Sequence, residues 1–288
     1  MLKSIFSVRN NSTHKIITIL GIKINLKRDF VSMKTNMLLL QDKIKTYVMA
    51  TTINAKLEKY RNCHQNKEIV IVGGGASLKY YKHLGDDKIY IGINRAYKIK
   101  DTKFDYLFCQ DREPDILDEI NFINYRSESC KKFIGHITLA DTPYRYRLNH
   151  YVQIKNSELY ILDNERMGKI PINISIEPFA DLCGTVFSAM QFCLYTNPKR
   201  IYLYGFDCNV SHSFEKEEAK WDLSYQYNSW IKIKEFIEQN THGIEIISVN
   251  PVSLKGLFKD VYTQSYLDAH PELLKDNIEI IKEDILNA

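Results

Sequence analysis

Glu68-Ile-Val-Ile-Val-Gly-Gly-Gly-Ala-Ser-Leu78 joins a run of β-branched residues directly to three consecutive glycines. Such a run is typical of a buried strand, and glycine punctuates strands and helices because it accepts turn conformations. The residues that follow favour a helix to about Leu84. We therefore predict a strand, a glycine turn and a helix in direct succession.

The same alternation recurs along the rest of the chain. Further strands are predicted at Lys88–Ile93, Phe104–Cys109, Lys132–Ile137, Arg200–Tyr204 and Ile244–Val249, and helices at Gly184–Tyr195 and Trp221–Gln239. Thr138–Ser175 is irregular and reads as a lid or an insertion. Strands separated by helix-length segments indicate an α/β fold, with a mainly parallel sheet and helices on both faces.

The first part of the chain differs from the remainder in net charge and in residue composition. Residues 1–67 hold 13 basic and three acidic residues, a net +10, whereas the remainder holds 26 basic and 32 acidic residues, a net −6. Lys15–Lys27 has the pattern of a hairpin, and Val31–Arg61 lacks Gly and Pro and favours one or two helices. We divide the chain into a basic hairpin and helical extension (1–66), a nucleotide-binding catalytic domain (67–268) and a C-terminal helix (269–288).

Composition and charge narrow the function classes. The 288 residues are 44% hydrophobic and 26% charged, which is typical of globular proteins. No uncharged apolar run reaches the roughly 18 residues of a spanning helix, and no secretory signal is recognised, so we expect a cytoplasmic protein. The six cysteines form no CxxC pair, and neither zinc nor disulfides are expected.

The basic extension is attracted to anionic surfaces, which suggests peripheral contact with a membrane through residues 1–67. A solvated basic face, partner packing and self-association into a homo-oligomer are left open. The chain has no zinc-finger spacing and no aromatic RNA-binding motif, so we expect no nucleic-acid partner.

Gly73-Gly74-Gly75-Ala76-Ser77 is the first candidate site. Glycines let backbone N–H groups approach an anion, and a phosphate would meet the positive end of the following helix. Ser77 could cap that helix or bind a phosphate oxygen. The turn matches neither a Walker A loop nor a dinucleotide fingerprint, and a purely structural turn is the alternative.

Other polar residues follow the predicted strands, where parallel sheets place their active sites. Asn94 and Gln110 could read a ribose or a pyrimidine edge, and Asp111 and Arg112 follow directly, with Arg112 able to hold a phosphate. The remaining candidates are Gly184 and Thr185 at a helix start, Asp207 after a strand, and His212 in the next loop. Loop capping is the alternative for each side chain. A histidine pKa of about 6.5 would suit His212 as a general base.

Taken together, Gly73-Gly-Gly-Ala-Ser-Leu78, Asn94, Cys183-Gly-Thr185, Arg200-Ile-Tyr-Leu-Tyr-Gly-Phe-Asp207 and Val249-Asn-Pro-Val-Ser-Leu254 resemble motifs of the bacterial lipooligosaccharide α-2,3-sialyltransferases. The resemblance covers roughly residues 68–258. The sequence departs from the family at two places. Gly74 stands where that family carries an asparagine, and Tyr225 or its neighbours stand where the family carries its general-base histidine. A histidine soon after Gly205-Phe206-Asp207, as His212 is here, is also similar to the arrangement in the Maf motility-accessory and 6-hydroxymethylpterin pyrophosphokinase-like families.

The resemblance implies a Rossmann-like domain of modified GT-A type that binds a CMP-sugar and transfers the sugar with inversion, without a cofactor or an essential metal. On that basis we expect a glycosyltransferase of surface-polysaccharide synthesis, with a nucleotide-sugar donor and a glycan acceptor. Asp207 would orient the sugar and His212 would act as the base. A pyrophosphokinase-like enzyme using ATP and Mg²⁺, and a noncatalytic nucleotide-sugar-binding assembly factor, are the alternatives.

Overall fold

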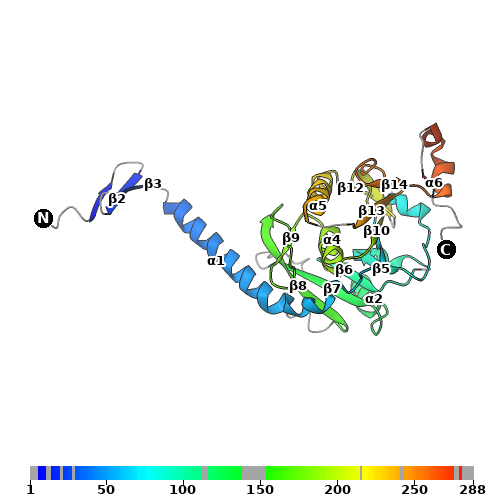
Figure 1. Ribbon diagram of the computed structural model, residues 1–288, viewed down its shortest axis with the longest axis horizontal. Helices are drawn as coiled ribbons and strands as arrows, with labels where there is room; N and C mark the ends of the chain where they lie inside the picture. Colours follow the sequence, from blue (N-terminus) through cyan, green and yellow to red (C-terminus); the bar gives the residue numbers. More distant parts are fainter. Residues whose placement is uncertain are drawn as a thin grey trace. The chain divides into compact units, whose positions relative to one another are not determined.

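A computed structural model of the chain divides it into two compact units, Met1–Lys45 and Thr46–Ala288 (Figure 1). The structure describes residues 6–10, 14–19, 22–27, 30–100, 102–111, 116–137, 154–214, 216–240, 243–275 and 279–280; within these it does not describe the side chains of residues 6–37, 39, 116, 164, 211–212, 216–221 and 275. Among the described helices, none is long and apolar enough to cross a membrane.

The first unit holds a small antiparallel sheet. Its strands are β1 (Phe6–Asn10), β2 (His14–Ile19) and β3 (Ile22–Lys27), in the order β1-β2-β3. The β2–β3 pair confirms the predicted hairpin, and β1 adds a third strand to it. Helix α1 (Phe30–Ile53) begins in this unit and continues past its end.

The second unit is built on a nine-stranded sheet in the order β14-β13-β10-β4-β5-β6-β7-β8-β9. Every neighbouring pair is parallel, which confirms the predicted α/β class. The strands are β4 (Glu68–Val72), β5 (Ile89–Ile93), β6 (Tyr106–Cys109), β7 (Lys131–Ile137), β8 (Ser157–Arg166), β9 (Phe179–Asp181), β10 (Arg200–Tyr204), β13 (Glu245–Val249) and β14 (Lys259–Val261).

Helices and short 3-10 turns connect these strands. The helices are α2 (Ile116–Asn124), α4 (Thr185–Thr196), α5 (Gln226–Asn240) and α6 (Gln264–Ala269). The 3-10 turns are η1 (Asn54–Tyr60), η2 (Ala76–Tyr80), η3 (Asn94–Lys98) and η4 (Pro271–Lys275). A two-stranded antiparallel hairpin, β11 (Val210–Ser213) with β12 (Lys216–Asp222), follows β10.

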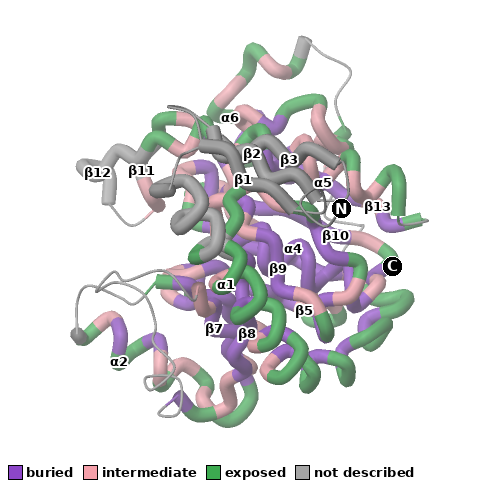
Figure 2. Tube along the Cα trace, turned by 90° about the vertical axis from the view of Figure 1, so that its left-hand side faces the viewer, coloured by how far each residue is buried: buried purple, intermediate pink, exposed green. Residues whose placement is uncertain are grey.

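The core lies on both faces of the nine-stranded sheet. Ile69 and Ile71 of β4 pack on one face, together with the fully buried helix α4, and Val70 and Val72 pack on the other. Because both faces are covered, the strands are continuous hydrophobic runs rather than alternating ones. Figure 2 shows the buried strands at the centre of the unit.

The second unit begins at Thr46, earlier than the boundary predicted between residues 66 and 67. Residues 46–66 belong to it, because Leu57, Tyr60 and His64 are buried in its interior. The Asn54 side chain also accepts a hydrogen bond from Ile161 N and donates one to the Glu177 carbonyl, at 3.0 Å each. The predicted helix over 31–61 is α1 followed by η1.

Three other secondary-structure predictions are wrong. The helix expected to reach Leu84 is only the five-residue turn η2. The segment expected to be irregular, 138–175, contains the ten-residue strand β8, although residues 138–153 lie outside the described ones. Of the C-terminal helix expected over 269–288, the described residues form the five-residue turn η4 and a bridge from Ile280 to Tyr262.

Candidate functional site

The order of the strands creates a topological switch point between β4 and β10. From the central β4 the chain adds β5 to β9 on one side, and then returns to place β10 on the other side. Open α/β sheets bind their ligands at such a point, outside the carboxyl ends of the central strands. The glycine turn follows β4 and Gly205-Phe206-Asp207 follows β10, so the sheet brings these two predicted segments together.

The glycine turn is packed against the end of β10. The Gly73 N–H donates to the Tyr204 carbonyl at 2.8 Å, and the Gly75 N–H donates to the Gly205 carbonyl at 2.9 Å. A Cβ on Gly73 would lie 2.5 Å from the Phe206 ring. The expectation of three amides open to an anion is therefore wrong, because the close approach of backbones already uses two of them.

Gly74 differs from its neighbours. It is exposed, and a Cβ built on it would meet nothing within 4 Å. Its carbonyl accepts the Phe214 N–H at 3.1 Å, whereas its own N–H has no hydrogen-bond partner within the described part of the chain. Of the three glycine amides, that of Gly74 is the one placed to bind an anion.

Asp207 fills the space in which a phosphate was expected. The side chain is 5% exposed, and its Oδ2 accepts the Ser77 N–H at 3.0 Å. The Ser77 hydroxyl donates to the other carboxylate oxygen. Burial raises the pKa of Asp207 above its usual value, although hydrogen bonds from Ser77 and Ala76 oppose the shift. Ser77 therefore donates its hydroxyl proton to the protein itself and not to a phosphate.

Two asparagines follow the strands that neighbour β4. Asn94 follows β5 with φ 51°, and Asn209 follows Asp207 beyond β10. The side-chain carbonyl oxygen of each is buried and has no hydrogen-bond partner among the described residues. Asn94 was predicted from its place at a strand end. Asn209 was not, because only the strand order brings it beside β4.

The start of α4 lies at the same edge of the sheet. Gln110 is 4% exposed at the end of β6, and its Nε2 donates to Ser188 Oγ at 3.0 Å, in the first turns of α4. Gly184 precedes the helix, and a Cβ there would lie 2.8 Å from Nε2 of Gln226. Thr185, the first residue of the helix, is buried. Gln110 and the α4 start thus form one contact, which the sequence had not predicted.

The remaining predicted residues are placed only in part. Asp111 follows Gln110 and is exposed, while Arg112 lies outside the described residues. His212 lies on β11, whose next residue, Ser213, bridges to Gly75. The backbone of His212 is therefore close to the glycine turn, and its side chain is outside what the structure describes.

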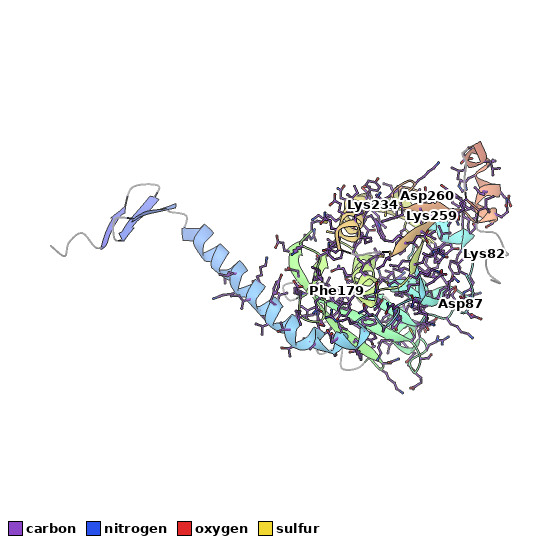
Figure 3. The ribbon with its side chains drawn as sticks, viewed as in Figure 1. Lys82, Asp87, Phe179, Lys234, Lys259 and Asp260 are labelled. Atoms are coloured by element: carbon purple, nitrogen blue, oxygen red, sulfur yellow. The ribbon has the colours of Figure 1, made fainter. Side chains whose placement is uncertain are left out.

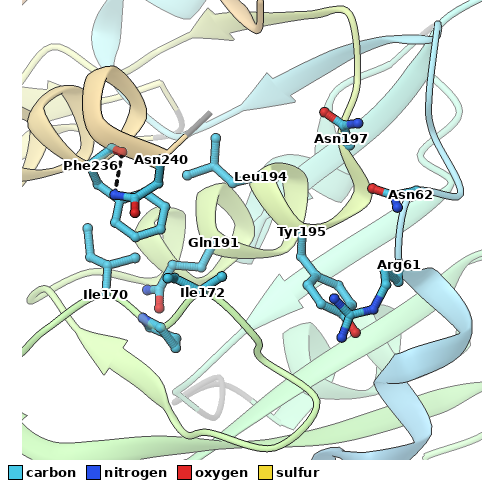
Figure 4. A pocket seen from close by; sticks show the side chains of 11 residues that line it. Arg61, Asn62, Ile170, Ile172, Gln191, Leu194, Tyr195, Asn197, Phe236 and Asn240 are labelled. Carbon is cyan, nitrogen blue, oxygen red and sulfur yellow. Dashed lines mark hydrogen bonds between the residues drawn. The ribbon is translucent and has the colours of Figure 1, made fainter. Parts of the chain in front are cut away.

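Two described cavities lie away from this edge. One, of about 370 Å³, is lined by Arg61, Ile170 and Tyr195 among others, at the amino edge of the sheet where α4 ends (Figure 4). The guanidinium of Arg61 forms an ion pair there, since its Nε lies 2.6 Å from Glu58 Oε1. The other, of about 350 Å³, lies between α5 and the start of β13 and includes Lys234, which Figure 3 labels. Neither cavity includes a predicted site residue.

Within the described residues, no group of three or more His, Cys, Asp and Glu side chains could hold a metal ion. No protein-family model and no curated protein matches the sequence. Among solved structures, the chain is similar to the MAf glycosyltransferase from Magnetospirillum magneticum AMB-1, with 11% identity and a TM-score of 0.40. The match covers 80% of this chain and 41% of that protein, so the chain spans less than half of its length.

Proposed function

We propose that the second unit is a glycosyltransferase that binds a nucleotide-sugar at the carboxyl ends of β4 and β10. The observation that carries the proposal is the pair of buried oxygens of Asn94 and Asn209, which have no partner among the described residues and which follow the two strands that neighbour β4. A buried acceptor without a donor costs about 1–3 kcal/mol. A nucleoside carries hydroxyl and amino donors that would satisfy both oxygens.

The donor phosphate is assigned to the open side of the turn. Gly74 is exposed there, and no side chain that the structure describes lies within 4 Å of a Cβ built on it. Asp207 is then a positioning residue, because its carboxylate holds Ser77 and the shape of the turn. This arrangement replaces our sequence-based expectation that Ser77 touches the phosphate and Asp207 the sugar.

The proposed donor, acceptor, stereochemistry and metal requirement are based on the sequence motifs. Because they resemble the sialyltransferases, we propose a CMP-activated acidic sugar as donor, inverting transfer to a glycan hydroxyl of a surface polysaccharide, and no metal requirement. His212 is proposed as the base, since its backbone lies beside the turn that holds the donor. Gln110, Gly184 and Thr185 lie at the end of β6 and the start of α4 and are proposed to contact the donor.

Nucleotide-dependent thermal stabilisation tests the proposal. The protein is unfolded with CMP, CDP, UDP, GDP or ATP, with and without Mg²⁺. Ligand at 100 times its Kd stabilises by about 2.7 kcal/mol, or roughly 5–10 °C in a unit of this size. We expect CMP to stabilise without Mg²⁺, and Asn94→Ala to weaken the effect.

Asn66→Ala is the matched control, because Asn66 has the same left-handed backbone, with φ 65°, but precedes β4 at the opposite edge. Its response to CMP should equal that of the parent. Stabilisation by ATP with Mg²⁺ alone would instead indicate phosphoryl transfer, and no response to any nucleotide would refute a nucleotide site.

A further inference from the structure

Helix α1 carries a regular stripe of apolar residues along its length. The helix spans 24 residues, Phe30–Ile53. The stripe positions alternate at spacings of three and four residues; they hold the apolar Phe30, Met33, Met37, Leu40, Ile44 and Tyr47, and then the polar Thr51. This is the heptad spacing of the a and d positions of a coiled coil, sustained over about three heptads.

The stripe is exposed wherever the structure describes its side chains. Leu40 is 60% exposed and Ile44 is 56% exposed, and the adjacent Val48 is 60% exposed. The opposite face of the same helix is fully buried at Thr46 and Ala50, inside the second unit. Within α1, Leu40 and Ile44 of the first unit are therefore exposed, whereas Thr46 and Ala50 are buried in the second unit.

We propose that this stripe pairs with α1 of a second copy of the chain as a parallel, two-stranded coiled coil. A heptad stripe is self-complementary, because a and d side chains of one helix fit the holes between those of an identical helix. Ile44 occupies an a position and Leu40 a d position, and Ile at a with Leu at d favours two parallel strands. The other a positions hold Phe30, Met37 and Thr51, and the other d positions hold Met33 and Tyr47.

A lipid surface fits the helix less well. Helices that lie on membranes have one broad apolar face opposite one polar face. In α1 the apolar residues are spread around the axis, since Leu38 and Leu39 lie off the stripe and Ala50 lies on the buried face. The helix has no continuous polar face to turn toward water.

Analytical ultracentrifugation of the full chain between about 1 and 100 μM tests the pairing. We expect a concentration-dependent dimer. Ile44→Glu should make the protein monomeric, because it buries two carboxylates against each other. Leu38→Glu is the matched control: Leu38 is 52% exposed on the same helix but lies outside the stripe, so this variant should remain a dimer.

Disulfide crosslinking tests the parallel direction. In a parallel pair, residue 44 of one chain faces residue 44 of the other, so Ile44→Cys should crosslink under mild oxidation and Leu38→Cys should not. A parent that stays monomeric at 100 μM, a dimer that survives Ile44→Glu, or a larger oligomer would overturn the proposal. So would failure of the Ile44→Cys dimer to crosslink. A monomer that sediments with phosphatidylserine vesicles would assign the stripe to lipid instead.

Discussion

Replacing Asp207 should unfold the turn that borders the candidate site. In Asp207→Ala the Ser77 N–H and hydroxyl, both buried, lose a charged acceptor. Hydrogen bonds to charged groups contribute about 1.5–3 kcal/mol each, so we expect a loss of about 3–5 kcal/mol. For a unit of this size that is a fall in Tm of roughly 6–20 °C.

Asp207→Asn should cost less, about 1–2 kcal/mol, because the amide oxygen still accepts the Ser77 N–H and the hydroxyl can rotate to accept from the amide. Asp222 provides a matched control. It accepts hydrogen bonds from the same kinds of donor, a serine N–H (Ser224, 3.0 Å) and a serine hydroxyl (Ser224 Oγ, 2.6 Å), but it is exposed. Asp222→Ala should leave the Tm almost unchanged.

The assay is urea unfolding followed by circular dichroism. A loss below about 1 kcal/mol in Asp207→Ala, or an equal effect of Asp222→Ala, would refute the stabilising role of the Asp207–Ser77 hydrogen bonds, here called the clamp. A double-mutant cycle with Ser77→Ala checks the pair directly. The two effects should be non-additive, because either single change removes the hydrogen bond of the Ser77 hydroxyl, whereas only Asp207→Ala also removes the acceptor of the backbone N–H.

The clamp should also respond to pH. Burial raises the pKa of Asp207, so the folded protein binds this proton more tightly than the unfolded chain does. The resulting stabilisation is fully present below the unfolded pKa and is lost as pH rises through the folded pKa. The free-energy difference between the parent and Asp207→Asn should therefore be largest near pH 4 and decline toward neutral pH.

Three further predictions concern other residues. Gly75→Ala should destabilise by about 1–3 kcal/mol, because its Cβ would lie 2.7 Å from the Asp207 carboxyl, whereas Gly74→Ala, in open space, should be neutral in the same unfolding assay. Burial lowers the pKa of His64 from 6.5 to about 4, so about 3 kcal/mol of stability should be lost as pH falls across that range. His64→Gln should lack this dependence in unfolding curves at pH 4 to 7. If the protein is a glycosyltransferase, His212→Ala should lower kcat by about 10² to 10⁴ with the fold intact, and an unchanged kcat would exclude it as the base.

Most of the sheet could be predicted from local patterns. The strands at 68–72 and 200–204 coincide with the predicted runs to the residue, because a strand buried on both faces is a continuous β-branched and aromatic segment. The strand at 157–166 was missed, since its residues include several charged and polar ones. Those side chains are satisfied by partners distant in sequence, such as Lys59 with Glu158 at 2.7 Å.

The sequence predicted that polar residues at strand ends gather at one edge of the sheet, but it did not predict which hydrogen bonds they make there. Polar residues at strand ends were expected to converge, and the parallel sheet places them at one edge. What each polar atom contacts depends on its neighbours across the sheet. Ser77 and Asp207 are 130 residues apart in sequence, so their hydrogen bond could not be read from either motif.

Local sequence determined the α/β class, the glycine turn and the heptad stripe of α1, because backbone preference and side-chain period act over a few residues. The tertiary structure alone decided that two of the three glycine amides are used internally and that the oxygens of Asn94 and Asn209 are not. Hydrogen bonding of a buried group depends on which strands become neighbours, and that order follows from the packing of the whole sheet.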